Sequence, residues 1–362
     1  MGFFHDSYAE ARRAFRGAAG QAGFDLHTLD YGLPGPDGKD LSIDVAVRSK
    51  GILRRAVVIS SGTHGVEGYF GSAVQLDQLS GRLAGWEPQA GEGVVLIHAV
   101  NPWGMAFQRR VNEDNVDQNR NFRKAGEAWS GAAANYALLD GLLNPASPPT
   151  RFDPFPLQAL PALLRHGFTA LKEAVASGQY DYPKGLFYGG AGPSRSHTLL
   201  KSHLPRLMGS VEQVVHLDLH TGSGRWGTYV LAADMPADGP DARRLRGAFG
   251  DEAVEAFDPT GVLYTIHGAL GPWMQELFPG VRYDCLLAEF GTYPNLSVLT
   301  TCRYENRVVQ HAPDDAALRR VARAKMMEAF CPADATWRAS CVAQADAVMG
   351  QAMAHVFGGG EA

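Results

Sequence analysis

The sequence predicts an α/β fold, a three-layer sandwich in which helices cover both faces of a mixed, mostly parallel central sheet. Continuous apolar runs of strand length recur along the chain, as in 55–60 (RAVVIS) and 93–100 (GVVLIHAV). Such runs are typical of strands that are buried on both faces. Stretches of helical character separate the runs, and strands that alternate with helices favour a mostly parallel sheet between helical layers.

The expected elements follow in order along the chain. The stretch 41–47 (LSIDVAV) alternates apolar and polar residues and predicts a half-buried strand. Continuous apolar runs predict further strands at 55–60, 93–100, 211–219, 229–233 and 285–290. Helices are expected between them, at roughly 66–80, 133–143, 166–178, 197–208, 241–257 and 269–278.

We expect residues 1–362 to form a single domain, with an insertion at about 123–210 and a helical C-terminal region at about 296–356. The insertion is rich in proline and contains the glycine-rich stretch 184–192. A loop of this length without a function of its own is uncommon. Two interpretations remain open: the insertion folds over a functional site and shapes substrate access, or it elaborates the packing on a remote face.

Charge and composition argue against several classes of protein. The chain carries 33 Lys and Arg against 38 Asp and Glu, with no basic run longer than two residues, so nucleic-acid and membrane-surface binding receive no support. No stretch of eighteen apolar residues is present, so no membrane span is expected. The four cysteines form no CxxC pair and the first residues lack a signal-peptide core. We therefore expect reduced thiols and a cytoplasmic protein, and the alternative is an exported protein with two disulfides.

A candidate metal site begins directly after the strand expected at 55–60. His64 and Glu67 lie three residues apart in the sequence His-Gly-Val-Glu. Open α/β sheets bind ligands beyond the carboxyl ends of their strands, and a spacing of three at the start of a helix places both side chains on one side. A histidine nitrogen and a carboxylate oxygen are suitable ligands for zinc.

The third ligand is expected from the strand at 211–219, which leads into His216, Asp218 and His220. Strand alternation places these three side chains on one face. We expect His220, the last of them, to be the third ligand, Asp218 to accept a hydrogen bond beside it, and His216 to be a buried structural residue. Three protein ligands leave a fourth position for water, as in catalytic zinc sites. One Zn²⁺ ion is therefore expected.

Two further features point to chemistry on a carboxylate or an amide. The stretch 101–122 contains a cluster of Arg and Asn: Arg109, Arg110, Arg120, Asn112, Asn115, Asn119 and Asn121. Such a cluster at the end of a strand favours a bound carboxylate or a developing oxyanion, and the alternative is a solvated polar loop. Glu289 ends the apolar strand at 285–290. Partial burial would raise its pKa and suit it as a general base, and the alternative is a structural ion pair.

Taken together, these motifs resemble those of the M14 zinc carboxypeptidases, in particular the DUF2817 branch, over most of residues 50–300. The family's HxxE motif matches His64 and Glu67, and its distant histidine matches His220. The run NPWGMAFQRRVNEDNVDQNRNF matches the family's NPxG…RxN…DxNRNF pattern almost letter for letter. The resemblance implies a zinc carboxypeptidase-like fold, also described as phosphorylase/hydrolase-like.

The resemblance also implies roles for individual residues. Arg110 matches the arginine that polarises the scissile carbonyl, and Asn119 with Arg120 matches the clamp on the substrate's terminal carboxylate. Glu289 matches the catalytic glutamate. Tyr264 precedes a glycine-containing turn that leads to a Trp, the layout of the family's mobile tyrosine.

These implications predict a zinc-dependent hydrolase that cleaves an amide bond next to a free carboxylate, a metallocarboxypeptidase acting on short peptides. The sequence DLHTG around His220 is closer to the related aspartoacylases and succinylglutamate desuccinylases, so a deacylase of N-acyl amino acids is the alternative. A catalytically silent zinc- or carboxylate-binding module is a second alternative, against which Glu289 and Arg110 argue. The pattern GSGRWG at 222–227 precedes an expected strand, not a helix, which argues against dinucleotide binding.

Overall fold

The computed structural model describes residues 2–150, 155, 157–161, 177–256 and 266–358, and these fold around one eight-stranded sheet with the order β1-β2-β4-β3-β5-β8-β6-β7. The strands are β1 (Asp25–Pro34), β2 (Asp40–Ser49), β3 (Arg55–Ser61), β4 (Glu92–His98), β5 (Gln213–Thr221), β6 (Tyr229–Ala233), β7 (Val254–Ala256) and β8 (Arg282–Phe290). The central strands β4, β3, β5 and β8 are parallel to one another, and β2 and β6 flank them in antiparallel orientation. The predicted mixed α/β sheet is therefore confirmed.

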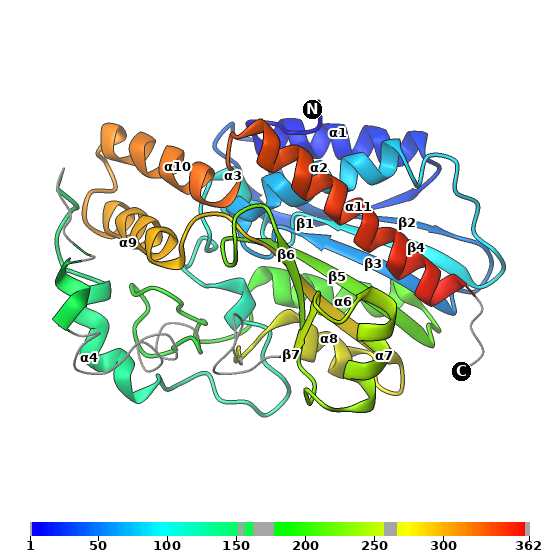
Figure 1. Cartoon of the computed structure of the whole chain (residues 1–362). Coiled ribbons are helices and arrows are strands. Elements are labelled where there is room, and N and C mark those ends of the chain that lie inside the picture. Colours follow the sequence, from blue (N-terminus) through cyan, green and yellow to red (C-terminus); the bar gives the residue numbers. More distant parts are fainter. Residues whose placement is uncertain (1, 151–154, 156, 162–176, 257–265, 359–362) are drawn as a thin grey trace.

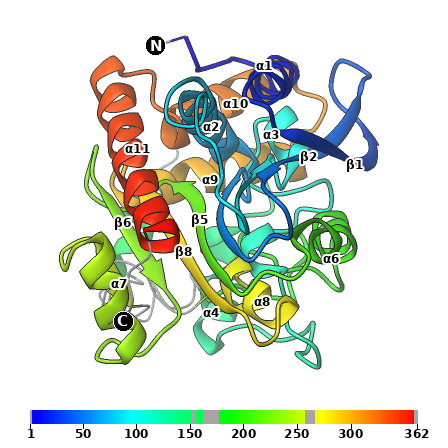
Figure 2. The same cartoon turned by 90° about the vertical axis from the view of Figure 1, so that its right-hand side faces the viewer.

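Helices form a layer on each face of this sheet. The helices are α1 (Tyr8–Gln21), α2 (Gly68–Ser80), α3 (Pro102–Ala106), α4 (Ala134–Leu143), α6 (Arg195–Met208), α7 (Pro240–Phe249), α8 (Leu270–Leu277), α9 (Asn295–His311), α10 (Ala316–Phe330) and α11 (Ala335–Phe357), with 3₁₀ turns η1 (Gly65–Glu67) and η2 (Gln118–Arg120). Helices α1, α2 and α11 cover one face, and α6 and α8 cover the other (Figures 1 and 2).

The continuous apolar runs arise because the central strands face a core on both sides. Val57 and Ile59 of β3 pack into the core under α1, α2 and α11, while Val58 packs into the core under α6 and α8. A strand buried on both faces cannot show the alternation of a half-exposed strand. This explains why apolar length, and not periodicity, identifies β3, β4 and β5 in the sequence.

A third apolar cluster lies beside the sheet and contains Val66, next to the predicted ligand Glu67. It joins residues of α4, α9 and α10, among them Leu139, Cys302 and Phe330. Figure 1 shows these three helices together, to one side of the helices that cover the sheet. The carboxyl ends of β3, β5 and β8 therefore meet a second body of helices, and the predicted site lies near this junction.

The sequence prediction missed or misplaced some elements. It did not anticipate α1 or β1, and the helix expected over 241–257 is wrong in its last part. Helix α7 ends at Phe249 because Gly250 has a φ of 99°, and β7 follows at Val254–Ala256. Most of the helix expected at 166–178 lies outside the described residues.

Two expectations about the covalent and membrane state can be compared with the structure. All four cysteines lie within the described residues, where they are buried and free. Among the described helices, none combines the length and the apolar character needed to cross a bilayer.

Candidate metal centre

His64, Glu67 and His220 come together at the carboxyl ends of β3 and β5, and their ligand atoms lie within 4.8 Å of one another. His64 Nδ1 lies 2.8 Å from Glu67 Oε1, and His220 Nδ1 lies 3.0 Å from Glu67 Oε2. The two Nδ1 atoms are 3.2 Å apart. Two nitrogen ligands of one tetrahedral zinc ion lie about 3.3 Å apart. The three side chains therefore have both the chemistry and the spacing of a zinc site.

The backbone that carries His64 and Glu67 depends on one close approach. A Cβ on Gly65 would lie 2.1 Å from the backbone carbonyl carbon of Gly104, so only glycine fits between the two ligands. This approach allows the N–H groups of Gly65 and Val66 to donate to the carbonyls of Arg110 and Arg109, at 3.1 and 2.8 Å. The ligand turn is thus fixed to the arginine-containing loop.

A buried chain of hydrogen bonds orients His220. Tyr283 Oη donates to His216 Nδ1 at 3.0 Å, and His216 Nε2 lies 2.7 Å from Ser60 Oγ. Ser60 Oγ donates to Asp218 Oδ1 at 2.5 Å, and Asp218 Oδ2 lies 2.6 Å from His220 Nε2. Each donor in this chain faces an acceptor only if His220 carries its hydrogen on Nε2. The lone pair on Nδ1 is then left for a metal ion, which is the support expected of Asp218.

Arg110 and Asp117 both contact the Nε2 atom of His64, and the sequence reasoning did not single out Asp117. Its Oδ1 lies 3.0 Å from His64 Nε2, and its Oδ2 pairs with the guanidinium of Arg110, which also lies 2.7 Å from His64 Nε2. Although burial opposes ionisation, the charge of Arg110 holds the pKa of Asp117 well below its usual range. The available signal was its position two residues before Asn119 in the segment DQNRNF.

The charges around the three ligands favour a cation. Burial disfavours a charged imidazole, yet the charge and the hydrogen bond of Asp218, together with Glu67, raise the pKa of His220 well above its usual value. Burial likewise opposes ionisation of Glu67, but His64 and His220 lower its pKa to about 2. Buried carboxylates that together stabilise positive charge on an imidazole also stabilise a metal ion at the same position.

Glu289 lies beside this centre on β8, in register with His220 on β5. It is buried, and its Oε1 accepts a 2.7 Å hydrogen bond from the N–H of Ser223. Burial, and after it the charge of Glu67, raises its pKa to about 8. Glu289 forms no ion pair with any residue that the structure describes, so the alternative of a structural ion pair receives no support.

The Arg and Asn cluster divides into two groups. Arg109, Asn112, Asn115 and Asn121 serve the local structure; for example, Arg109 pairs with Glu305 at 2.5 Å. Arg110 reaches the metal ligands, as described above. Asn119 Oδ1 accepts the N–H of Leu270 at 3.1 Å and its carbonyl accepts Arg120 Nη1 at 3.0 Å, and both side chains are buried. Tyr264 lies outside the described residues.

The described part of the insertion packs directly on this loop. The N–H of Asp117 donates to the carbonyl of Tyr188 at 2.7 Å, and Asn121 Nδ2 donates to the carbonyl of Gly189 at 2.7 Å. The guanidinium carbon of Arg110 lies 5.5 Å from the ring centroid of Phe187. Of the two interpretations of the insertion, packing on a remote face does not hold for these residues.

Comparison with known protein families identifies the family to which the chain belongs. The family described as "Protein of unknown function (DUF2817)" matches residues 4–344. The chain belongs to the DUF2817 family. Among curated proteins, none matches the sequence.

Solved structures similar to this DUF2817 member include several hydrolases. Bovine thrombin-activatable fibrinolysis inhibitor, in complex with tick carboxypeptidase inhibitor, is 16% identical with a TM-score of 0.49, over 89% of this chain and 96% of that chain. Carboxypeptidase A from Helicoverpa armigera is 13% identical with a TM-score of 0.44, over 91% and 74%. Murein-tripeptide amidase MpaA from Escherichia coli O157 is 17% identical with a TM-score of 0.38, over 84% and 95%.

Proposed function

We propose that the chain is a zinc-dependent hydrolase that cleaves an amide bond next to a free carboxylate, a carboxypeptidase of short peptides. One observation carries the proposal: the Nδ1 atoms of His64 and His220 face each other beside Glu67. The Nε2 atom of His64 contacts Asp117, and the Nε2 atom of His220 contacts Asp218. His64, Glu67 and His220 would hold the ion. When bound, zinc supplies Lewis-acid chemistry, polarising a carbonyl and lowering the pKa of a water molecule.

Glu289 is the proposed general base and acid. Burial raises its pKa, which suits the carboxylate to accept a proton from the attacking water and later deliver it to the leaving amine. The water oxygen forms a bond to the carbonyl carbon, and the carbon–nitrogen bond breaks as the amine receives that proton. The N–H of Ser223 fixes one oxygen of the carboxylate during both transfers.

The remaining proposed roles belong to groups that bind anions. Arg110, anchored by Asp117, donates to the oxygen on which negative charge develops, and a well-placed donor of this kind contributes about 10²–10³ in rate. Asn119 and Arg120 bind the substrate's free carboxylate. Tyr264 closes over the substrate, an assignment that rests on the sequence resemblance alone.

A deacylase of small N-acyl amino acids is the second candidate, favoured by the position of the insertion. Phe187 lies against Arg110, and Tyr188 and Gly189 bond to the neighbouring loop, so the insertion borders the reacting groups. An insertion in this position would limit the length of substrate that can reach the metal centre. A panel of dipeptides and N-acyl amino acids at equal concentration separates the two candidates by kcat/KM.

The test of the proposal uses two substitutions and one control. Glu289→Gln should keep stoichiometric zinc and lose about 10²–10⁴ in kcat, whereas Glu252→Gln, an exposed glutamate, should keep full activity. His64→Ala should lose the metal. A fully active Glu289→Gln variant would refute the assigned base, and a wild-type protein that binds zinc but hydrolyses no member of either panel would support the silent module.

A further inference from the structure

A cavity of about 590 Å³ opens on α10 beside the loop that follows α3. It is lined by Gln108, Ala316, Arg319, Arg320, Arg323, Ala324 and Met327. Arg323 follows Arg319 by four residues and Arg320 by three, so its side chain lies beside both on the helix surface. None of the lining residues is acidic, so the lining carries three positive charges without a balancing negative one.

Three carboxylates of α9, α10 and the residue before α10 are engaged elsewhere. Asp315 accepts the N–H groups of Ala317 and Leu318 at the start of α10, at 3.0 and 2.9 Å. Glu328 accepts the hydroxyl of Tyr293 at 2.5 Å, and the buried Glu305 binds Arg109. In the part of the chain that the structure describes, Arg320 and Arg323 form no ion pair and donate no hydrogen bond.

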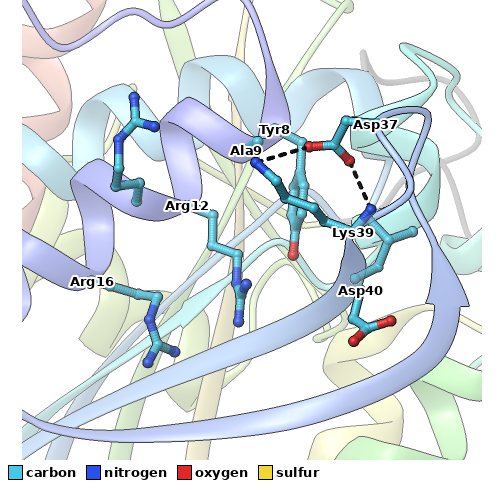
Figure 3. A pocket seen from close by; sticks show the side chains of 9 residues that line it. Tyr8, Ala9, Arg12, Arg16, Asp37, Lys39 and Asp40 are labelled. Atoms are coloured by element: carbon cyan, nitrogen blue, oxygen red, sulfur yellow. Dashed lines mark hydrogen bonds and ion pairs between the residues drawn. The ribbon is translucent and has the colours of Figure 1, made fainter.

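Another arginine-lined cavity shows a different arrangement. This cavity, of about 300 Å³, lies between α1 and the β1–β2 turn (Figure 3). There, Arg12 Nε and Arg16 Nη1 each lie 2.7 Å from a carboxylate oxygen of Asp44, and Lys39 pairs with Asp37 at 3.6 Å. Carboxylates of the protein therefore neutralise most of the positive charges in this cavity. The cavity on α10 lacks such partners, which points to a negative charge supplied from outside.

The clustering of the α10 arginines is unfavourable on its own. Burial, and after it the charge of Arg319, lowers the pKa of Arg323, which means that its positive charge is destabilised where it lies. Guanidinium groups bind the oxygens of phosphate in paired, charge-assisted hydrogen bonds. An oxyanion among the three would remove the repulsion and satisfy donors that lack a protein acceptor.

We propose that the cavity on α10 binds a small oxyanion of the phosphate type, either free phosphate or the phosphoryl group of a small molecule. The site shares no residue with the three metal ligands, but Gln108 connects it to the arginine-containing loop. Gln108 directly precedes Arg109 and Arg110, whose carbonyls accept the N–H groups of the ligand turn. The inference does not depend on the proposed hydrolase activity, because its test measures binding.

Isothermal titration of the full-length protein with inorganic phosphate, at constant ionic strength set with chloride, tests the site. The wild-type protein should bind phosphate at one site, and Arg320→Gln/Arg323→Gln should weaken that binding by about tenfold or more, since two charged donors are lost. The matched control is Arg243→Gln/Arg246→Gln on α7, a pair with the same spacing and similar exposure, which should bind as the wild type does. Glycerol 3-phosphate in a second titration separates the sources: tighter binding than phosphate indicates a phosphorylated molecule, and weaker binding indicates free phosphate.

Three outcomes would overturn the proposal: no binding to the wild type, equal binding to the α10 double variant, or loss of binding in Arg110→Gln alone, which would place the anion at the metal centre. A measurement on the wild-type protein keeps the test valid if the double variant does not fold. Phosphate should protect Arg319, Arg320 and Arg323 from modification by phenylglyoxal, as read by peptide mass spectrometry. Unprotected arginines on α10 would likewise contradict the site.

Discussion

Replacing Asp218 by Asn removes one charge and one acceptor from the hydrogen-bond chain that orients His220. The carboxylate of Asp218 accepts bonds from Ser60 Oγ, Thr63 Oγ1 and His220 Nε2, at 2.5, 2.9 and 2.6 Å. An asparagine offers a single acceptor oxygen and an NH₂ group. If the oxygen stays with the two hydroxyls, the NH₂ group faces the Nε2–H of His220, and two donors meet.

His220 can relieve that conflict by moving its hydrogen to Nδ1, the atom that would bind the metal ion. The opposite orientation of the amide leaves its NH₂ group against Ser60, whose hydroxyl lies 2.5 Å from the carboxylate in the native chain. Loss of such a supporting acceptor costs about 10–100-fold in metal affinity. This corresponds to about 1.4–2.8 kcal/mol of binding free energy.

Competition with a fluorescent zinc chelator measures this loss directly. Asp218→Asn should raise the dissociation constant for zinc by the stated factor, and Asp234→Asn, an exposed aspartate beyond β6, should leave it unchanged. Circular dichroism of both variants reports whether the fold is retained. Zinc affinity within twofold of the wild type in a folded Asp218→Asn variant would refute the orientation argument.

Three further predictions concern the fold, the ligand turn and the insertion. Burial lowers the pKa of His98 to about 4 from the usual 6.5, so the unfolded chain binds a proton over this interval that the folded chain does not. The free energy of unfolding should therefore fall as the pH decreases from 6.5 to 4. His98→Phe should reduce this pH dependence by up to about 1.4 kcal/mol per pH unit. An identical slope in the variant and the wild type would contradict the burial argument. Gly65→Ala forces a Cβ against the backbone of Gly104, so it should destabilise the fold by about 1–3 kcal/mol in urea unfolding and weaken zinc binding. Gly17→Ala, in open space on α1, is the control and should do neither. Asn121→Leu removes the hydrogen bond to the carbonyl of Gly189 and should raise KM without a matching loss of zinc. An unaltered KM would show that this contact of the insertion has no effect on substrate binding.

The sequence was sufficient for the features that depend on burial and on spacing. Long apolar runs identified β3 and β5 because both strands are covered on both faces. Alternation along β5 placed His216, Asp218 and His220 on one side, and all three take part in one hydrogen-bond chain in the structure. The HxxE spacing likewise brought His64 and Glu67 together in a single turn.

Features that depend on long-range contacts were not predictable in this way. Asp117 resembles any polar residue of a loop, and its contact with His64 joins residues 53 positions apart, which no local pattern indicates. Strand β1 mixes exposed and buried positions at the edge of the sheet, so it lacks the long apolar run of a central strand. The contact of Phe187 with Arg110 depends on the path of the insertion, for which the local sequence has no periodic pattern.

The insertion meets the arginine-containing loop mainly through backbone carbonyls, those of Pro183, Gly185, Tyr188 and Gly189. A carbonyl is present whatever the side chain, so the side chains of Pro183 and Tyr188 can change while these bonds are kept. Gly185 and Gly189 are restricted, because a Cβ would lie 2.7 Å from Tyr136 Oη and 2.2 Å from Tyr180 Cε1, respectively. The surface beside the arginine-containing loop can therefore change at Pro183 and Tyr188 while the backbone contacts that hold the insertion stay the same.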